Sequence, residues 1–308
     1  MEIKISLITI CKNSEATLER TLQSVISQSY KNIEYIVIDG NSSDKTKEII
    51  EKYRDSIHYY ISEPDRNSSD ALNKGIRVAT GDYISFVNSD DYLVDSNVVK
   101  DVVEAINSNR NCLIFYGDVE IRPNPKLSND ITIFKPPSPD DLLDNITLNI
   151  DPFLGASYYS SKVFATVGYF NISTVYANDL EWFLKVFAYW EAKYFYYIPR
   201  TIFSYSMCGE SSRDIEVTLK AAYEFIDNAP MFQTEYWLKR RIRNMQQKII
   251  YLEKFCQDTQ ELSMNRLIII QEVTKQVQFT TIFKNFLREK FFVPFRYLLN
   301  RVYRRDFK

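Results

Sequence analysis

The chain has 308 residues, of which 45% are hydrophobic and 15% aromatic, and its formal net charge is −2. These values exclude a disordered or collagen-like chain and suffice for one large α/β domain with an accessory segment. Residues 1–214 carry 21 Lys and Arg against 30 Asp and Glu, whereas residues 215–308 carry 17 against 10. We therefore expect an acidic front part and a basic extension with different roles.

The first 120 residues alternate between strand-like and helix-like stretches. Strands are predicted where apolar and β-branched residues run together: Ile3–Ile10, Ile33–Ile38, His58–Ile61, Tyr83–Val87 and Leu113–Val119. Helices are predicted after Asn13 and Ser14 and over the ranges 44–53, 70–78 and 97–107. This alternation indicates a doubly wound α/β sheet, in which ligands bind beyond the carboxyl ends of the strands.

The pattern is looser after Ile121, where prolines punctuate a long loop region of the kind that is usually functional. Order returns with a short helix at Ser160–Val167, a clearer helix at Asp179–Tyr189 and a strand at Lys193–Tyr197. Only helix is expected beyond Ile215.

Cysteine and histidine content excludes several classes of site. The four cysteines lie far apart without a C-x-x-C pair, which argues against a zinc site or a disulfide framework and fits a reduced cytosolic setting. One histidine, His58, is too few for zinc–histidine chemistry or a serine–histidine triad. The sequence shows no signal peptide and no membrane span, so we expect a cytoplasmic protein, either free or peripheral at the inner face of the membrane.

Two adjacent carboxylates, Asp90 and Asp91, directly follow the predicted strand Tyr83–Val87. An ordinary polar turn explains such a pair equally well, but Asp39 and Asp65 follow neighbouring strands. Several acids at one sheet edge repel one another unless a cation or a base edge is bound. Since Mg²⁺ and Mn²⁺ prefer carboxylate oxygens and bridge to substrate phosphates, we predict one of these ions as the cofactor.

Other nucleotide-binding motifs are missing. Cys11-Lys12-Asn13-Ser14 follows the first strand, where a dinucleotide-binding fold would carry G-x-G-x-x-G and a P-loop protein its glycine-rich lysine motif. The sequence therefore disfavours a nicotinamide-dependent enzyme and a P-loop enzyme.

Five segments in order resemble glycosyltransferase family 2, and the resemblance covers roughly residues 1–210. They are Ser6–Asn13 with Leu22–Val25 and Gln28–Tyr30, Tyr35–Asp44, Ser62–Arg66, Asp70–Ile76 and Gly81–Asp91. The resemblance implies a GT-A fold, a mixed α/β sheet flanked by helices, over residues 1–214. Residues 1–120 would form the nucleotide-sugar half and residues 121–214 the acceptor half, with a helical extension at 215–308.

The resemblance also implies roles for single residues in the donor site. Asp39 would bind the nucleotide base, usually uracil, beside Thr9 and Lys12, and Asp65 would seat the base or ribose. Asp70 and Asn73 would lie on the helix below the donor. Ser89, Asp90 and Asp91 match the family's metal motif, with Asp91 as the direct ligand, although Ser89 stands where a carboxylate is usual.

The acceptor side matches the family in fewer positions. The Asn178-Asp179 pair resembles its catalytic pair, which makes Asp179 the general base of a single inverting displacement; the alternative is a plain helix cap. Arg213 would contact the diphosphate, or lie in an exposed turn. Asn67 replaces a frequent glycine, and Asp151-Pro152 replaces a frequent His-Pro, which leaves the acceptor class open.

The tail, residues 284–308, interleaves eight Lys and Arg with aromatic residues. Such a segment fits an anionic membrane surface, and it fits equally well packing on the domain or on a second subunit. Nucleic acid is not an expected partner, because the front part is acidic.

The sequence thus predicts an inverting glycosyltransferase of the hexosyltransferase type. It would use a nucleotide-sugar donor, a UDP-sugar by preference, and a glycan or lipid-linked acceptor in surface polysaccharide synthesis. The alternatives are a non-catalytic sugar-nucleotide-binding scaffold and a nucleotidyltransferase. A nucleotidyltransferase would need a basic, glycine-rich phosphate loop early in the chain, and the sequence contains none. The donor sugar, acceptor, linkage and oligomeric state are left open.

Overall fold

The computed structural model describes residues 2–122, 130–146, 153–174, 176–208, 215–237, 239–241 and 243–244. The chain forms two compact units, Met1–Ile226 and Asp227–Lys308. Every element that carries a predicted site residue belongs to the first unit.

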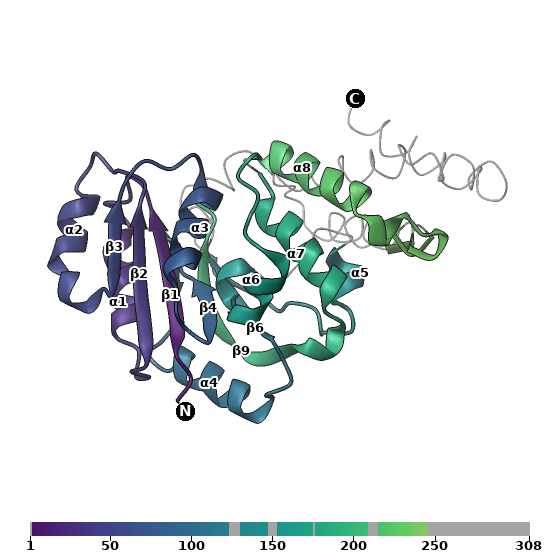
Figure 1. The fold of residues 1–308 in the computed structure, drawn as a ribbon, viewed down its shortest axis with the longest axis horizontal. Coiled ribbons are helices and arrows are strands. Elements are labelled where there is room, and N and C mark those ends of the chain that lie inside the picture. Colours follow the sequence, from purple (N-terminus) through teal and green to yellow (C-terminus); the bar gives the residue numbers. More distant parts are fainter. Residues whose placement is uncertain are drawn as a thin grey trace. The chain divides into compact units, whose positions relative to one another are not determined.

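Nine strands of the described residues form one mixed sheet in the order β3-β2-β1-β4-β8-β6-β9-β5, with β7 paired to β6 (Figure 1). Strands β1 to β4 are parallel, whereas β8 is antiparallel to both β4 and β6 and so joins a second half to the first. The strands are β1 Ile5–Cys11, β2 Ile33–Asp39, β3 Tyr59–Ser62, β4 Tyr83–Phe86, β5 Tyr92–Leu93, β6 Ile114–Arg122, β7 Thr132–Phe134, β8 Ser157–Ser160 and β9 Phe195–Ser206.

Helices flank this sheet, as predicted for the fold class. They are α1 Leu18–Ile26, α2 Thr46–Lys52, α3 Ser68–Val78, α4 Val98–Ser108, α5 Leu142–Ile146, α6 Ser161–Val167, α7 Asn178–Tyr189 and α8 Ile215–Asn228. None of the described helices is long and apolar enough to cross a membrane.

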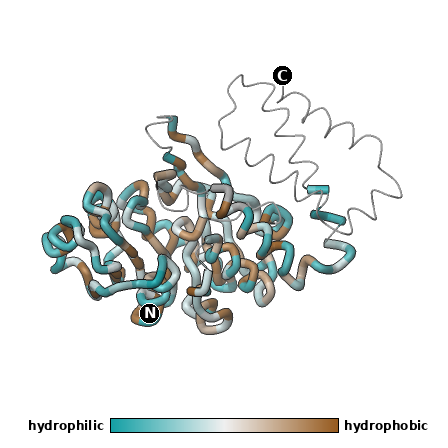
Figure 2. The backbone as a smooth tube through the Cα atoms, turned by 90° about the horizontal axis from the view of Figure 1, so that it is seen from above, coloured by the Kyte–Doolittle hydropathy of each residue, from teal (hydrophilic) through white to brown (hydrophobic). Residues whose placement is uncertain are grey.

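The sheet buries both of its faces. On one face, Ile5 and Leu7 of β1 join the apolar side of α1 and the valines of α4 in one core. On the other face, Ile8 meets Gly75 of α3. Because both faces are covered, β1 and β2 are almost entirely buried, whereas the covering helices carry both hydrophobic and hydrophilic stretches (Figure 2).

An aromatic cluster fills the second face under α6 and α7. Phe86 of β4 meets Phe164 of α6 at 6.2 Å between ring centroids and Phe170 at 5.9 Å. Trp182 of α7 stacks on Phe164 at 4.8 Å, and its Nε1 donates to the Gly168 carbonyl oxygen at 2.8 Å. This cluster fixes where α7 begins relative to the parallel strands.

Most predicted elements are confirmed, with ends that differ by a few residues. The sequence missed β5, β7, β8 and α5, and it ended β9 at Tyr197, whereas that strand runs to Ser206. The missed strands have two to four residues each, too few for a repeating pattern. The predicted boundary at residue 214 stays a prediction; the first compact unit continues to Ile226.

The contact between Gly75 and Ile8 gives a stability prediction. A Cβ atom at Gly75 would lie 2.5 Å from Ile8 Cγ2, which belongs to a stiff, fully buried side chain. Overpacking typically costs about 1–3 kcal/mol, which exceeds the gain of up to about 1 kcal/mol from replacing a helical glycine by alanine. We therefore expect Gly75→Ala to lower the free energy of unfolding, measured by urea denaturation.

The matched background is Ile8→Ala, which removes the clashing methyl group. In that background Gly75→Ala should cost less than in the wild-type chain, so the two substitutions should not be additive. A higher midpoint for Gly75→Ala alone would contradict this account of the packing.

Candidate active site

The loops after β1, β2, β3 and β4 meet at one edge of the sheet, because these strands are parallel and in register. The Oγ atoms of Ser14 and Ser89 lie 2.8 Å apart and join the first loop to the last. The backbone N–H of Asn13 donates to Ser42 Oγ at 2.8 Å and joins the first loop to the second. The predicted donor-site residues of these loops thus stand on one hydrogen-bonded edge.

Asp39 ends β2 and is fully buried. Its carboxylate accepts hydrogen bonds from the N–H and Oγ of Ser42 and, at 2.5 Å, from Ser62 Oγ. Burial, together with the Asp39 charge, raises the pKa of the neighbouring Cys11 thiol. Asp39 therefore ties the ends of β2 and β3 together before any ligand is considered.

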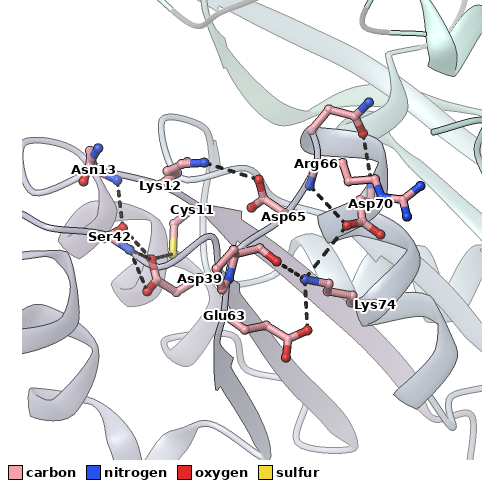
Figure 3. A network of polar contacts seen from close by, with 12 residues as sticks. Cys11, Lys12, Asn13, Asp39, Ser42, Glu63, Asp65, Arg66, Asp70 and Lys74 are labelled. Atoms are coloured by element: carbon pink, nitrogen blue, oxygen red, sulfur yellow. Dashed lines mark hydrogen bonds and ion pairs between the residues drawn. The ribbon is translucent and has the colours of Figure 1, made fainter. Parts of the chain in front are cut away.

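Lys12 and Asp65 point toward each other across this edge, with 3.5 Å between Lys12 Nζ and Asp65 Oδ1 (Figure 3). The carboxylate of Asp65 also lies against Gly40, where an added Cβ atom would come within 2.2 Å of Asp65 Oδ2. The Asp65 carboxylate therefore occupies the space that a side chain at position 40 would need. Lys12 is exposed at this point, and its charge faces solvent.

Thr9 of β1 is the residue that the family resemblance puts beside Asp39 and the nucleotide base. It is fully buried, its Oγ1 donates to the Val87 carbonyl oxygen at 2.7 Å, and it lies 2.9 Å from the hydroxyl of Tyr35. Thr9 therefore holds Val87 in place through this hydrogen bond, at the start of the loop that contains Asp90 and Asp91.

Asp70 and Asn73 of α3 have different partners. The Asp70 carboxylate accepts from the Arg66 N–H at 3.2 Å and lies 4.0 Å from Lys74 Nζ, next to the loop after β3 (Figure 3). Asn73 is 2% exposed, and its side chain is bonded to the backbone of Phe170 instead. Asp70 thus lies beside the loop after β3, whereas Asn73 contacts the stretch of chain between α6 and α7.

Asp91 is 2% exposed, and its Oδ1 accepts from the Ser206 N–H at 2.8 Å. Burial, and then repulsion from Asp90, raises the pKa of the Asp91 carboxyl well above its ordinary value. Within the part of the chain that the structure describes, its second oxygen accepts no hydrogen bond. An additional positive charge here would stabilise the carboxylate.

Two arginines that the sequence analysis missed lie beside this pair. The guanidinium carbons of Arg20 and Arg122 are 4.5 and 4.6 Å from the centroid of the Tyr92 ring. Both arginines donate to the Asp90 carbonyl oxygen, at 3.3 and 2.8 Å. Burial and repulsion from Arg122 lower the pKa of Arg20. No sequence signal joins these two residues, because they lie far apart along the chain.

The residues around Asp91 fit a divalent cation that also binds substrate phosphates. The described residues hold no cluster of three or more His, Cys, Asp or Glu, so a cage made of protein ligands alone is not formed there. Mg²⁺ usually takes one or two carboxylates and leaves its other positions to water and phosphate. Asp91 offers its second oxygen. Asn88, in the loop after β4, adds a buried Oδ1 that has no hydrogen-bond partner among the described residues.

Asp179 lies in the first turn of α7. Its side chain is exposed to solvent, and Oδ1 accepts from the Leu180 N–H at 2.9 Å. Partial loss of hydration raises the pKa of this carboxyl group above its ordinary value. The helix cap is Ala177 and makes no side-chain cap bond, so Asp179 is not the capping residue.

Two predicted features lie outside the described residues: Arg213, and the Asp151-Pro152 pair. The tail at 284–308 lies outside them as well.

The family model described as "Glycosyl transferase family 2" matches residues 6–162, just over half of the chain. Asp179 lies beyond the matched residues, so its role does not follow from this match.

The Escherichia coli protein named UDP-Glc:alpha-D-GlcNAc-diphosphoundecaprenol beta-1,3-glucosyltransferase WfaP is 38% identical over 95 residues, which cover 30% of this chain and 38% of that protein. The chain spans about two fifths of the length of the curated relatives that it matches at 38% identity or more.

Solved structures show the same fold at low identity. Staphylococcus aureus TarS 1-349 in complex with UDP-GlcNAc gives a TM-score of 0.56 at 18% identity, covering 90% of this chain and 81% of that one. Mannosyltransferase PcManGT from Pyrobaculum calidifontis, in complex with GDP-Man and Mn2+, gives a TM-score of 0.53 at 12% identity, covering 93% and 83%.

The buried Asp91 carboxyl gives a prediction about the metal-free protein. Because the pKa of Asp91 is raised in the folded state, ionisation of Asp91 lowers the free energy of unfolding. This loss of stability is complete at pH values above the folded-state pKa. It disappears at pH values below the unfolded-state pKa of about 3.9. Asp91→Asn keeps an oxygen for the Ser206 N–H. We expect it to raise the melting temperature at neutral pH by roughly 2–6 °C, an effect of about 1–2 kcal/mol.

The measurement is the melting temperature of Asp91→Asn and of the wild-type chain with a chelator present. Repeated at lower pH, the difference between the two melting temperatures should shrink. Asp55→Asn, at an exposed position before β3, is the matched control and should leave the melting temperature unchanged. A lower melting temperature for Asp91→Asn at neutral pH would contradict the prediction.

Proposed function

The chain belongs to glycosyltransferase family 2, and from that premise we propose that it transfers a sugar from a nucleoside diphosphate sugar to a hydroxyl group with inversion. The observation that carries the proposal is the buried Asp91 carboxylate at the edge where the loops after β1 to β4 meet.

The donor site is proposed at the loops after β1, β2 and β3. Lys12 forms its exposed part and pairs with the largely buried Asp65 carboxylate, and Asp39 would hold the two strand ends beneath the nucleotide base. A UDP-sugar is the preferred donor, because the Escherichia coli relative is named for UDP-Glc and the TarS structure contains UDP-GlcNAc. Thr9 and Asn73 would support the donor site without contacting the donor. Thr9 would do so through its hydrogen bond to Val87, and Asn73 through its hydrogen bond from α3 to Phe170.

Mg²⁺ or Mn²⁺ would be held by Asp91, with Asp90 and Ser89 beside it. When bound, the ion would neutralise the diphosphate as it leaves. Arg20 and Arg122 add positive charge next to the same loop and hold its backbone through the Asp90 carbonyl oxygen. A further contact to the diphosphate is proposed for Arg213.

Asp179 is the proposed general base. Its carboxylate would take the proton of the acceptor hydroxyl while that oxygen attacks the anomeric carbon. The bond from the anomeric carbon to the diphosphate oxygen breaks in the same displacement, and the electron pair leaves with the nucleoside diphosphate. Among the described residues, only backbone N–H groups of its own helical turn donate to the Asp179 carboxylate, which leaves it able to accept this proton.

The proposed acceptor is a glycan or lipid-linked hydroxyl in surface polysaccharide synthesis. The support is the name of the Escherichia coli relative, which includes a diphosphoundecaprenol-linked sugar. Peripheral membrane contact through 284–308 is part of this proposal, and a cytoplasmic setting goes with it.

Nucleotide binding tests the donor site. We expect UDP with Mn²⁺ to raise the melting temperature, since a ligand present at about 100 times its Kd stabilises the folded state by about 2.7 kcal/mol. Asp91→Ala should abolish the part of the shift that requires Mn²⁺, and Asp55→Asn should retain it. No shift with UDP, GDP or dTDP in folded protein would exclude the proposal.

Turnover tests the base. Asp179→Asn should lower the rate of UDP release from the best UDP-sugar by at least about 100-fold, the scale of general base catalysis. The increase in melting temperature that UDP causes should stay unchanged. In the wild-type chain the rate should fall toward acid pH, because only the ionised carboxylate accepts the proton. The raised pKa places this fall above the ordinary midpoint of about 3.9. Full activity of Asp179→Asn would show that another group is the base.

A further inference from the structure

The α6–α7 segment, residues 168–177, carries the chain from the aromatic cluster to Asp179. Polar side chains connect this region to the first turns of α3 by hydrogen bonds, and three of the residues involved, Ser69, Asn73 and Asn178, are buried. Asn73 donates to the Phe170 carbonyl oxygen and accepts from the Phe170 N–H, both at 2.9 Å. One amide thus pairs with one backbone residue in both directions, as a neighbouring strand would.

Asn67 makes a second connection at the start of α3. Its Oδ1 accepts from the Asp70 N–H at 3.0 Å and caps the helix. Its Nδ2 donates to the carbonyl oxygens of Ile172 and Thr174, each at 3.1 Å. The residue that ends the donor-side loop therefore also holds the middle of the α6–α7 segment.

Asn178 makes the third connection, from the other direction. It is 6% exposed, and its Nδ2 donates to Ser69 Oγ and to the Thr174 carbonyl oxygen, each at 2.8 Å. Ala177, just before it, has φ of 54°, a left-handed conformation that is unfavourable for alanine. The neighbouring bonds hold this backbone in place, and Asp179 follows directly.

We propose that α3 positions the catalytic base, with Ser69, Asn73 and Asn178 as positioning residues that fix Asp179 relative to the donor-side edge. This inference rests on the proposed function. Since Asp70 of α3 stands on the donor-side edge and the same helix is bonded to the start of α7, one helix sets the distance between the donor and the base. A displacement of about 1 Å at a reacting group can lower a rate by about 100-fold.

The test is a double-mutant cycle on turnover with Ser69→Ala, Asn178→Ala and the pair. Each single variant should lower kcat for UDP release by about 10- to 100-fold and leave KM for the UDP-sugar within about twofold. The pair should be no slower than the worse single variant, because both remove the same hydrogen bond. Additive losses, or an unchanged kcat, would overturn the proposal.

Ser85→Ala is the matched control. It is the same substitution at a buried serine, but the Ser85 hydroxyl has no hydrogen-bond partner in the described part of the chain. Its kcat should equal that of the wild type. If Ser85→Ala slows turnover as much as Ser69→Ala, the loss reflects general destabilisation and the positioning role is wrong.

Hydrogen exchange gives a readout that does not depend on turnover. Ser69→Ala and Asn178→Ala should increase amide exchange in 170–182 and leave β1 to β4 unchanged. Unchanged exchange in 170–182 overturns the positioning role even if no UDP-sugar is turned over. If Ser69→Ala and Asn178→Ala exchange faster but the wild-type chain turns over no UDP-sugar, the proposed function is wrong and the structural role of these contacts stands.

Discussion

Parallel pairing of β1 with β2 on one side and β4 on the other is the constraint on which the site depends. It brings the loops that follow these strands to one edge, although their residues lie far apart in the sequence. Acidic side chains gathered there repel one another. The structure limits that repulsion with hydroxyl and N–H donors to Asp39, with Lys12 beside Asp65, and with two arginines beside Asp90.

Sequence reasoning found the elements whose signal is local. β1 and β2 are rich in apolar and β-branched residues, and α3 and α4 have clear helical spacing, so each could be recognised alone. β5 and β8 have two and four residues and exist through their pairing with β9 and with β4 and β6. Nothing in their own residues distinguishes them from loop.

The same division holds in the site. Asp90 and Asp91 could be recognised because they are adjacent and follow a strong strand. The Arg20–Tyr92–Arg122 group could not, since it is assembled from α1, β5 and β6. Thr9 and Asn73 were found as residues of interest, but their burial and their partners, Val87 and Phe170, depend on three-dimensional packing.

The pairing of Asn73 with the Phe170 backbone has a consequence for how such a chain can change over evolution. The amide contacts main-chain atoms at position 170, so these two bonds are indifferent to the identity of the residues that follow. A substitution at the exposed Ser173, for example, leaves both hydrogen bonds between Asn73 and the Phe170 backbone in place.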